Sequence, residues 1–171
     1  MTVRRTTLDQ TLSEVFGFAE FRSDQREIAA RLVAGEDAFV LMPTGGGKSL
    51  CYQLPALHRE GTGLVVSPLI SLMKDQVDAL RQAGVAAAAL HSGLGPAEAR
   101  ETLELLRSGR LDLLYVAPER LMSPVFLDLL GGVRLSLLAV DEAHCVSQWG
   151  TTFVPSTCGW AGCGRGFRGY R

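Results

Sequence analysis

Two hydrophobic patterns alternate along most of the chain. Runs that are apolar throughout predict buried strands over residues 37–42, 63–67, 85–90, 112–117 and 135–142. Amphipathic spacing predicts helices around Leu8, Leu12, Val15 and Phe16, from Ser23–Asp24 to Gly35, over 71–83 and over 96–108, with short helical pieces after 117. At the second of these helices, Asp24 and Glu27 resemble a capping box. Apolar strands that alternate with amphipathic helices predict an α/β fold, in which helices cover both faces of a parallel sheet.

Composition narrows the class of protein without naming a function. The chain has 171 residues, of which 47% are hydrophobic and 20% are charged, so one ordinary globular domain is expected. The net charge of −1 argues against a global basic field, and any nucleic-acid contact must come from a local patch. The N-terminus lacks the apolar core of a signal peptide, and no apolar run reaches the length of a membrane span, so a cytoplasmic protein is expected. The cysteines are Cys51, Cys145, Cys158 and Cys163, and their spacing favours neither disulfides nor a zinc site.

The stretch M-P-T-G-G-G-K-S at 42–49 lies between a predicted strand and a predicted helix, which is the context of a phosphate-binding P-loop. Thr44, Gly45, Gly46 and Gly47 would form the loop, whose backbone N–H groups surround phosphate oxygens. Lys48 would reach the β- and γ-phosphates, and Ser49 would bind Mg²⁺. Met42 stands where a strict Walker A motif begins with glycine, and the alternative is a glycine-rich turn before a helix.

The stretch D-E-A-H at 141–144 follows an apolar predicted strand. Asp141 could hold Mg²⁺ through water, and Glu142 could orient and deprotonate an attacking water molecule. A lone Asp-Glu pair is usually a solvated loop, but downstream of a P-loop it is typical of a Walker B motif. His144 is expected to couple the nucleotide state to neighbouring loops, or else to be a structural histidine.

These motifs occur together with F-G-F-A-E-F-R-S-D-Q-R-E-I at 16–28, S-P-L-I-S-L-M-K-D-Q at 67–76, Y-V-A-P-E-R-L at 115–121 and D-E-A-H-C-V-S-Q-W-G at 141–150. In this combination and order, residues 8–150 resemble the first motor domain of RecQ-family DNA helicases. The resemblance implies a RecA-like P-loop NTPase fold that uses ATP and Mg²⁺. It also implies an ATP-dependent 3′-to-5′ DNA-unwinding motor of two RecA-like domains, acting in DNA recombination and repair at the nucleoid. Its partner would be single-stranded or 3′-tailed duplex DNA, and nothing indicates an obligate oligomer.

The resemblance also assigns residues one by one. Phe18, Arg22 and Gln25 match the adenine-reading motif, with Phe18 in place of the family's tyrosine. Ser67, Pro68 and Lys74, together with Pro118, Glu119 and Arg120, match segments that grip the DNA backbone. Gln148 and Trp149 begin an aromatic-rich loop that stacks on single-stranded DNA. The alternatives are a surface residue for Gln25, solvated charges for Lys74 and Arg120, and a core position for Trp149.

The pattern changes abruptly after Gly150. Leucine, lysine and acidic residues are absent from 151–171, whereas glycine, arginine and cysteine are frequent. One base lost after the Gly150 codon explains this change, because restoring it permits His-Asp-Phe-Arg-Pro-Glu-Tyr, the family's continuation after Gln-Trp-Gly. We therefore expect residues 1–150 to be an incomplete first helicase domain and 151–171 to be an out-of-frame, disordered tail. The strand that follows Walker B in such sheets, between the Walker A and Walker B strands, would then be missing.

Three functions remain at this stage. The leading hypothesis is a truncated RecQ-type helicase that cannot unwind DNA alone. The alternative is a non-enzymatic module that binds nucleotide or single-stranded DNA. A P-loop kinase or transporter ATPase needs neither D-E-A-H nor S-P-L-I-S-L-M-K-D-Q, which disfavours that class.

Overall fold

The computed structural model describes residues 7–43 and 45–142. Within these residues the centre of the molecule is a sheet of four parallel strands in the order β2-β3-β1-β4. The strands are β1 (Thr62–Val66), β2 (Ala87–Leu90), β3 (Leu113–Val116) and β4 (Leu135–Val140). β1 and β3 lie inside the sheet and are buried throughout, which explains why the sequence shows them as apolar runs without alternation.

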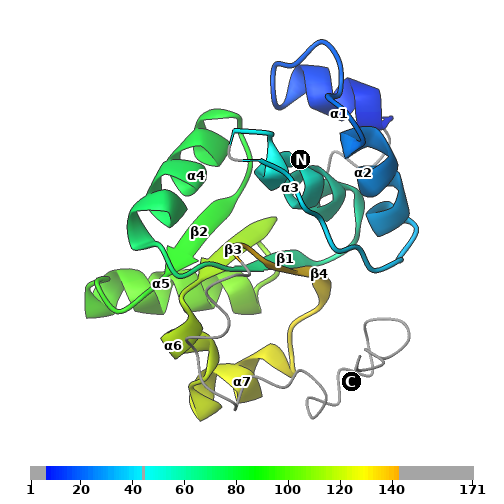
Figure 1. Cartoon of the computed structure of the whole chain (residues 1–171). Helices are drawn as coiled ribbons and strands as arrows, with labels where there is room; N and C mark the ends of the chain where they lie inside the picture. The colour runs from blue at the N-terminus through cyan, green and yellow to red at the C-terminus, as the bar shows by residue number, and fades with distance from the viewer. Residues whose placement is uncertain (1–6, 44, 143–171) are drawn as a thin grey trace.

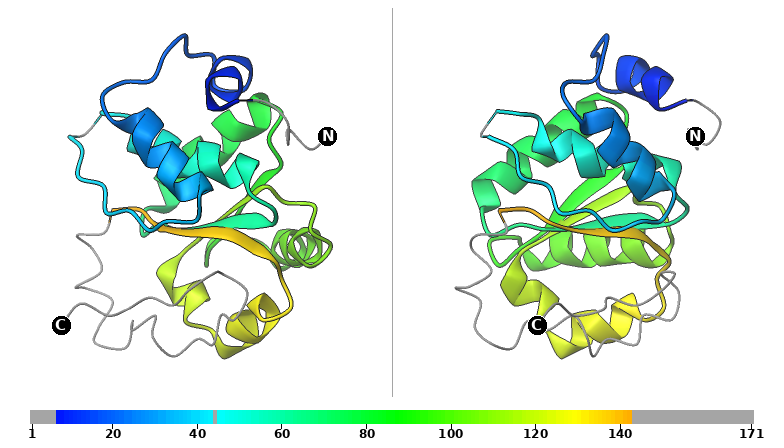
Figure 2. Two further views of the ribbon diagram at one scale, coloured as in Figure 1. Left: turned by 90° about the vertical axis from the view of Figure 1, so that its right-hand side faces the viewer. Right: turned by 45° about the vertical axis from the view of Figure 1, so that its right-hand side comes forward.

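Helices cover both faces of the sheet (Figure 1). In chain order they are α1 (Leu8–Glu14), α2 (Gln25–Val33), α3 (Lys48–His58), α4 (Ile70–Gln82), α5 (Pro96–Arg107), α6 (Pro118–Leu121) and α7 (Pro124–Leu130). On one face, α3 and α4 contribute Tyr52, Met73 and Val77 to a core with Tyr115 of β3. On the other face, residues of α5, α6 and α7 pack against β1, β2 and β3. The sheet is thus the middle layer of the domain, and the views in Figure 2 show helices above and below it.

Helices α1 and α2 form an additional layer outside α3. Leu12 of α1 and Ala29 of α2 pack against Leu50 and Leu54 of α3 and form a separate small core. Helix α3 is therefore enclosed between the sheet and two other helices, and its residues from Leu50 to Leu57 are all buried. This enclosure fixes the helix that begins directly after the glycine-rich loop.

The carboxyl ends of three strands lie at one level. Val66 of β1 is in register with Val116 of β3 and with Val140 of β4. The residues that follow continue the ladder: the Asp141 N–H donates to the Val66 carbonyl at 2.8 Å, and the Ser67 N–H donates to the Val116 carbonyl at 3.1 Å. Segments that follow different strands are thereby brought to one edge of the sheet, where α/β folds bind ligands.

The structure confirms the parallel sheet covered on both faces and four of the five predicted strands, each within two residues of the expected bounds. The predicted helices are present, although α1 ends at Glu14, before Val15 and Phe16. The predicted capping box at Asp24 is wrong, because the Asp24 side chain makes no capping hydrogen bond within the described residues. A capping box forms instead at α1, between Thr7 and Gln10.

The predicted strand at 37–42 is also wrong, because this fully described segment belongs to no strand. Phe39 and Leu41 are 82% and 84% exposed, whereas Val40 and Met42 are half-buried. The segment thus alternates like a strand but lacks a paired neighbour, and Figure 2 draws it as a plain line. Within the described sheet β4 is the last strand on this side. A strand needs a hydrogen-bonded neighbour, so apolar sequence alone did not place this segment in the sheet.

His58, at the end of α3, lies against α1, and we expect it to make the stability of the fold dependent on pH. Its Nε2 lies 2.8 Å from the Thr11 hydroxyl of α1, and burial lowers the pKa of His58. An unfolded histidine has a pKa near 6.5, so at pH values between the lowered pKa and 6.5 the unfolded chain binds more protons than the folded chain. The free energy of unfolding therefore falls as the pH drops below about 6.5. Thermal unfolding at pH 7.5 and 5.5 should show a loss that is smaller in His58→Gln. An equal loss in the wild type and in His58→Gln would contradict the assignment.

No helix in the described part of the chain is long and apolar enough to cross a membrane. Residues 151–171, which we interpret as out of frame, lie outside the described residues. The proposed division of the chain at Gly150 therefore stays a prediction.

Candidate functional site

The glycine-rich loop turns sharply into α3. Gly45 and Gly47 have φ values of +80° and +77°, which side chains other than glycine rarely adopt. The Gly46 N–H closes a turn on the Pro43 carbonyl at 3.0 Å. Lys48 and Ser49 are then the first two residues of α3, both half-buried, so they lie at the positive end of the helix dipole. A loop of this shape at a helix start is suited to binding an anion.

Gln25, which the sequence assigns to adenine, is hydrogen-bonded to the glycine-rich loop. Its Nε2 donates to the carbonyls of Gly46 and Gly47, each at 3.2 Å. Its Oε1 accepts from the Arg22 N–H at 2.8 Å, and its side chain is buried. A Cβ atom at Gly47 would collide with this amide, so the loop needs glycine there for space as well as for conformation. A bracing function of Gln25 was missed by sequence analysis, and the adenine contact stays a prediction.

Asp141 and Glu142 follow β4 at the carboxyl edge of the sheet, and both side chains are half-buried. The Asp141 Oδ1 accepts from the Glu142 N–H at 3.0 Å. Glu142 has a φ of +52°, a left-handed conformation that costs free energy for a residue other than glycine. The chain therefore turns sharply directly at the end of the strand.

Tyr52 connects the two motifs, and sequence analysis missed it. Its hydroxyl donates to the Asp141 Oδ2 at 3.3 Å, and its helix α3 begins with Lys48 and Ser49. Burial is the main reason that the pKa of Tyr52 is far above its usual range, so the phenol stays protonated and can donate. The available signal was the spacing: Tyr52 follows Ser49 by three residues in a helix, which places both on one face.

The residues at this edge fit a magnesium ion. Ser49 offers a hydroxyl and Asp141 offers carboxylate oxygens, the hard donors that Mg²⁺ prefers. Among the described residues no group of three or more His, Cys, Asp or Glu could hold a metal ion. A few oxygen donors without a complete protein cage are typical of sites at which Mg²⁺ is bound together with substrate phosphates.

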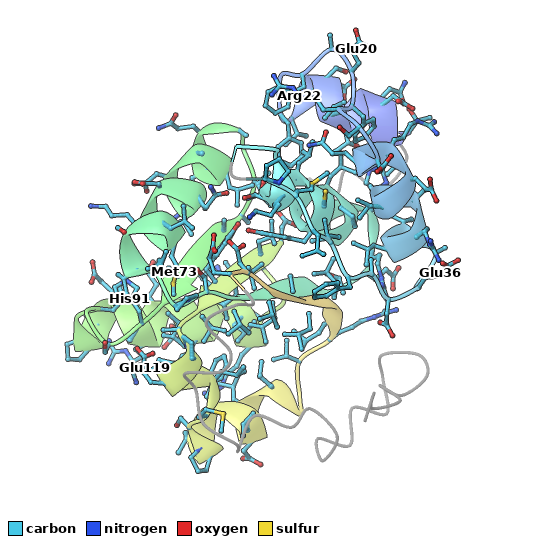
Figure 3. The ribbon with its side chains drawn as sticks, in the orientation of Figure 1. Glu20, Arg22, Glu36, Met73, His91 and Glu119 are labelled. Carbon is cyan, nitrogen blue, oxygen red and sulfur yellow. The ribbon has the colours of Figure 1, made fainter. Side chains whose placement is uncertain are left out.

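A second group of residues follows β1 and β3 at the same edge. The Ser67 hydroxyl and the Arg120 Nε are buried and have no hydrogen-bond partner within the described part of the chain. Lys74 is exposed on α4. Figure 3 labels Glu119, next to Arg120, on the same side of the molecule as Met73 and His91. Buried polar groups normally have partners, so Ser67 and Arg120 are candidates for contact with a ligand.

The other predicted site residues divide into two sets. Phe18 and Arg22 are exposed on the segment between α1 and α2, and Figure 3 shows Arg22 pointing away from the sheet. Thr44, His144, Gln148 and Trp149 lie outside the described residues, so their predicted functions are not tested. Pro68 and Pro118 are half-buried next to Ser67 and Arg120.

The sequence was compared with known families and curated proteins. A family model described as DEAD/DEAH box helicase matches residues 22–157. An "ATP-dependent DNA helicase RecQ" of Bacillus subtilis is 54% identical over 147 residues, which are 85% of this chain and 25% of that protein. A protein of the same name from Pasteurella multocida is 49% identical and is matched over 90% of this chain and 24% of its own length. The chain thus spans about a quarter of the length of these relatives.

Solved structures support the same fold at lower identity. A hypothetical ATP-dependent RNA helicase from Sulfolobus tokodaii superposes with a TM-score of 0.62 at 24% identity, over 82% of this chain and 42% of that chain. The helicase MrfA bound to DNA also gives a TM-score of 0.62, at 20% identity, over 82% of this chain and 21% of that one. The four-stranded parallel sheet is therefore that of a RecA-like helicase domain. With the family model matching most of the chain, this protein belongs to the DEAD/DEAH box helicases, and within them to the RecQ family.

Proposed function

We propose that this chain binds Mg-ATP between the start of α3 and the end of β4, as the nucleotide-binding part of an ATP-dependent 3′-to-5′ DNA helicase. The observation that carries the proposal is the hydrogen bond between Tyr52 of α3 and Asp141, which joins the glycine-rich loop and the acidic pair in one site. Each motif alone has an ordinary structural alternative. Their convergence at the carboxyl edge of a parallel sheet is what a nucleotide site of this class requires.

Each residue has a distinct task in the proposed site. The N–H groups of the loop bind phosphate oxygens, and Lys48 neutralises the charge of the β- and γ-phosphates. Ser49 and Asp141 would hold Mg²⁺. When bound, the metal ion supplies charge stabilisation to the phosphate oxygens. Glu142, the residue after Asp141, orients the attacking water and accepts its proton.

The DNA-binding part of the proposal uses the second group of residues. Ser67 and Arg120 carry buried polar atoms without partners in the described chain, and exposed Lys74 lies on the helix that follows Ser67. Because β1 and β4 end in register, these residues share an edge with Asp141. DNA bound after β1 would therefore lie at the same edge of the sheet as a nucleotide bound next to the end of β4. Unwinding itself is proposed for the larger protein of which the relatives are examples.

Gln25 provides a test of nucleotide selectivity. We expect wild-type protein to bind Mg-ATP more tightly than Mg-GTP by roughly tenfold, the effect of one or two hydrogen bonds to the base. Gln25→Ala should bind both nucleotides more weakly, because it removes the brace on Gly46 and Gly47, and should reduce the ATP-to-GTP ratio towards one. Competition titrations with a fluorescent ATP analogue measure both quantities.

The control for this test is Gln82→Ala, an exposed glutamine at the end of α4, which should change neither affinity nor ratio. If Gln25→Ala weakens ATP and GTP equally and leaves their ratio unchanged, Gln25 only braces the loop and does not read adenine. If the wild-type protein binds neither nucleotide, the proposed function is wrong.

A further inference from the structure

The Tyr52 hydroxyl lies at the junction of the two halves of the proposed site. Tyr52 is 9% exposed, and its donation to Asp141 Oδ2 crosses 89 positions of sequence. Ser49 lies three residues before Tyr52 on the same helix, so both are on one face of α3. One buried phenol thus joins the helix that carries Ser49 to Asp141, the other residue that we propose to hold the metal ion, although it belongs to neither motif.

We propose that Tyr52 is a positioning residue for the metal site, which fixes the carboxylate of Asp141 relative to Ser49. This inference rests on the proposed nucleotide function and deepens it. Each Asp141 oxygen has one donor: Oδ2 accepts from Tyr52, and Oδ1 accepts from the Glu142 N–H. Two donors on opposite oxygens set the plane of the carboxylate, and each oxygen keeps further lone pairs for water or metal.

Tyr52 can serve as an anchor because its own ring is fixed. It packs edge-on against Tyr115 of β3, with ring centroids 6.5 Å apart and an interplanar angle of 66°. Tyr115 is fully buried, and its hydroxyl accepts from the Gln53 Nε2 at 2.7 Å. The same Nε2 donates to the Gln76 Oε1 of α4, also at 2.7 Å. The support of Asp141 therefore extends through α3, β3 and α4.

This network also reaches the proposed DNA-binding helix. Gln76 is two residues after Lys74 on α4, so a displacement of α4 would move the Gln76–Gln53–Tyr115 hydrogen bonds. Outer-sphere residues that orient a metal ligand commonly contribute 10- to 100-fold in metal affinity. Tyr52 has the geometry for such an effect without contacting substrate.

The test is Tyr52→Phe, which keeps the buried ring and its packing on Tyr115 and removes only the hydroxyl. Mn²⁺, which prefers the same oxygen ligands as Mg²⁺, serves as the probe. We expect the affinity for Mn²⁺ in the presence of saturating ADP, measured by electron paramagnetic resonance, to fall roughly tenfold. The affinity for ADP in EDTA should stay at the wild-type value, because the phosphate contacts of the loop do not involve Tyr52.

The matched control is Thr62→Val, which removes another buried hydroxyl with a hydrogen bond, that of Thr62 to the Leu111 carbonyl at 2.8 Å. Thr62 begins β1, at the opposite end of the sheet, so this variant should lose stability but keep the Mn²⁺ affinity. A similar Mn²⁺ loss in both variants would overturn the proposal, since a general loss of stability would then explain it.

A second measurement asks whether Tyr52 acts through Asp141. In Asp141→Asn, adding Tyr52→Phe should cause no further loss of Mn²⁺ affinity, whereas independent effects would add. Unchanged affinity in Tyr52→Phe, or full additivity in the double variant, overturns the positioning function and leaves the nucleotide site intact. If the wild-type protein binds no Mn²⁺ with ADP, the proposed function itself fails, and the proposal for Tyr52 fails with it.

Discussion

Replacing Lys48 by alanine should abolish Mg-ATP binding, with a loss of at least about a hundredfold. Lys48 is the first residue of α3, directly after Gly47, and the enclosure of α3 by the sheet, α1 and α2 keeps it there. Its ammonium is the one side-chain cation of the glycine-rich loop at 42–49. In Lys48→Ala the negative charge of the bound phosphates would therefore lose its main counter-charge. Isothermal calorimetry of both proteins with Mg-ATP measures the change.

Arg107→Ala is the matched control for Lys48→Ala. Arg107 is an exposed cation in the last turn of α5, on the other face of the sheet, and its loss should leave ATP binding unchanged. Circular dichroism should show folded protein in all three samples. Equal ATP affinity in wild type and Lys48→Ala would show that the loop is a structural turn, which was the alternative for M-P-T-G-G-G-K-S.

The 171-residue chain on its own should hydrolyse ATP near the background rate and should not unwind DNA. The RecQ protein of Bacillus subtilis is about three and a half times as long, since the 147 matched residues are 25% of it. The resemblance to this family implies a second RecA-like domain that supplies an arginine to the γ-phosphate. Such an arginine contributes roughly 10³–10⁵ in rate in related phosphoryl-transfer enzymes. Even with Glu142 and the metal ligands in place, the charge that develops on the phosphate lacks the stabilisation that this arginine would give.

Phosphate release with and without single-stranded DNA, and strand separation of a 3′-tailed duplex, measure these two expectations. Glu142→Gln is the reference, because wild-type turnover equal to that of this variant shows that no hydrolysis depends on the proposed base. Nucleotide or DNA binding without turnover would then describe this chain as a binding module. Robust DNA-stimulated hydrolysis by the wild type would show that the second domain is dispensable for the chemistry.

Parts of the fold and site followed from local sequence alone. The strands β1 to β4 are short apolar runs, and each is separated from the next by amphipathic helical sequence. This order allows little but a parallel sheet with helices on both faces. The sequence also predicted Lys48 and Ser49 at the start of a helix and Asp141 at the end of a strand, and the structure has them there, because a glycine-rich turn before a helix and the end of an apolar run are both local signals.

Other features depended on contacts between distant segments. Residues 37–42 have the composition of a strand, but a strand also needs a neighbour to accept its hydrogen bonds, and sequence composition does not report the neighbour. Gln25 looked like a base-reading residue, and only the folded chain shows its amide bonded to Gly46 and Gly47. Asp24 and Glu27 had the spacing of a capping box, but the backbone of Asp24 does not take the extended conformation that such a cap needs.

The sequence by itself therefore determined the α/β architecture and the RecQ resemblance, since these depend on local periodicity and on short motifs, and it named the residues that we propose for phosphate and metal binding. The tertiary structure alone decided which edge β4 occupies, that α3 is enclosed on two sides, and that Tyr52 of α3 reaches Asp141. The physical reason is that a hydrogen bond across 89 positions depends on how α3 packs on the sheet, and no local pattern records that packing.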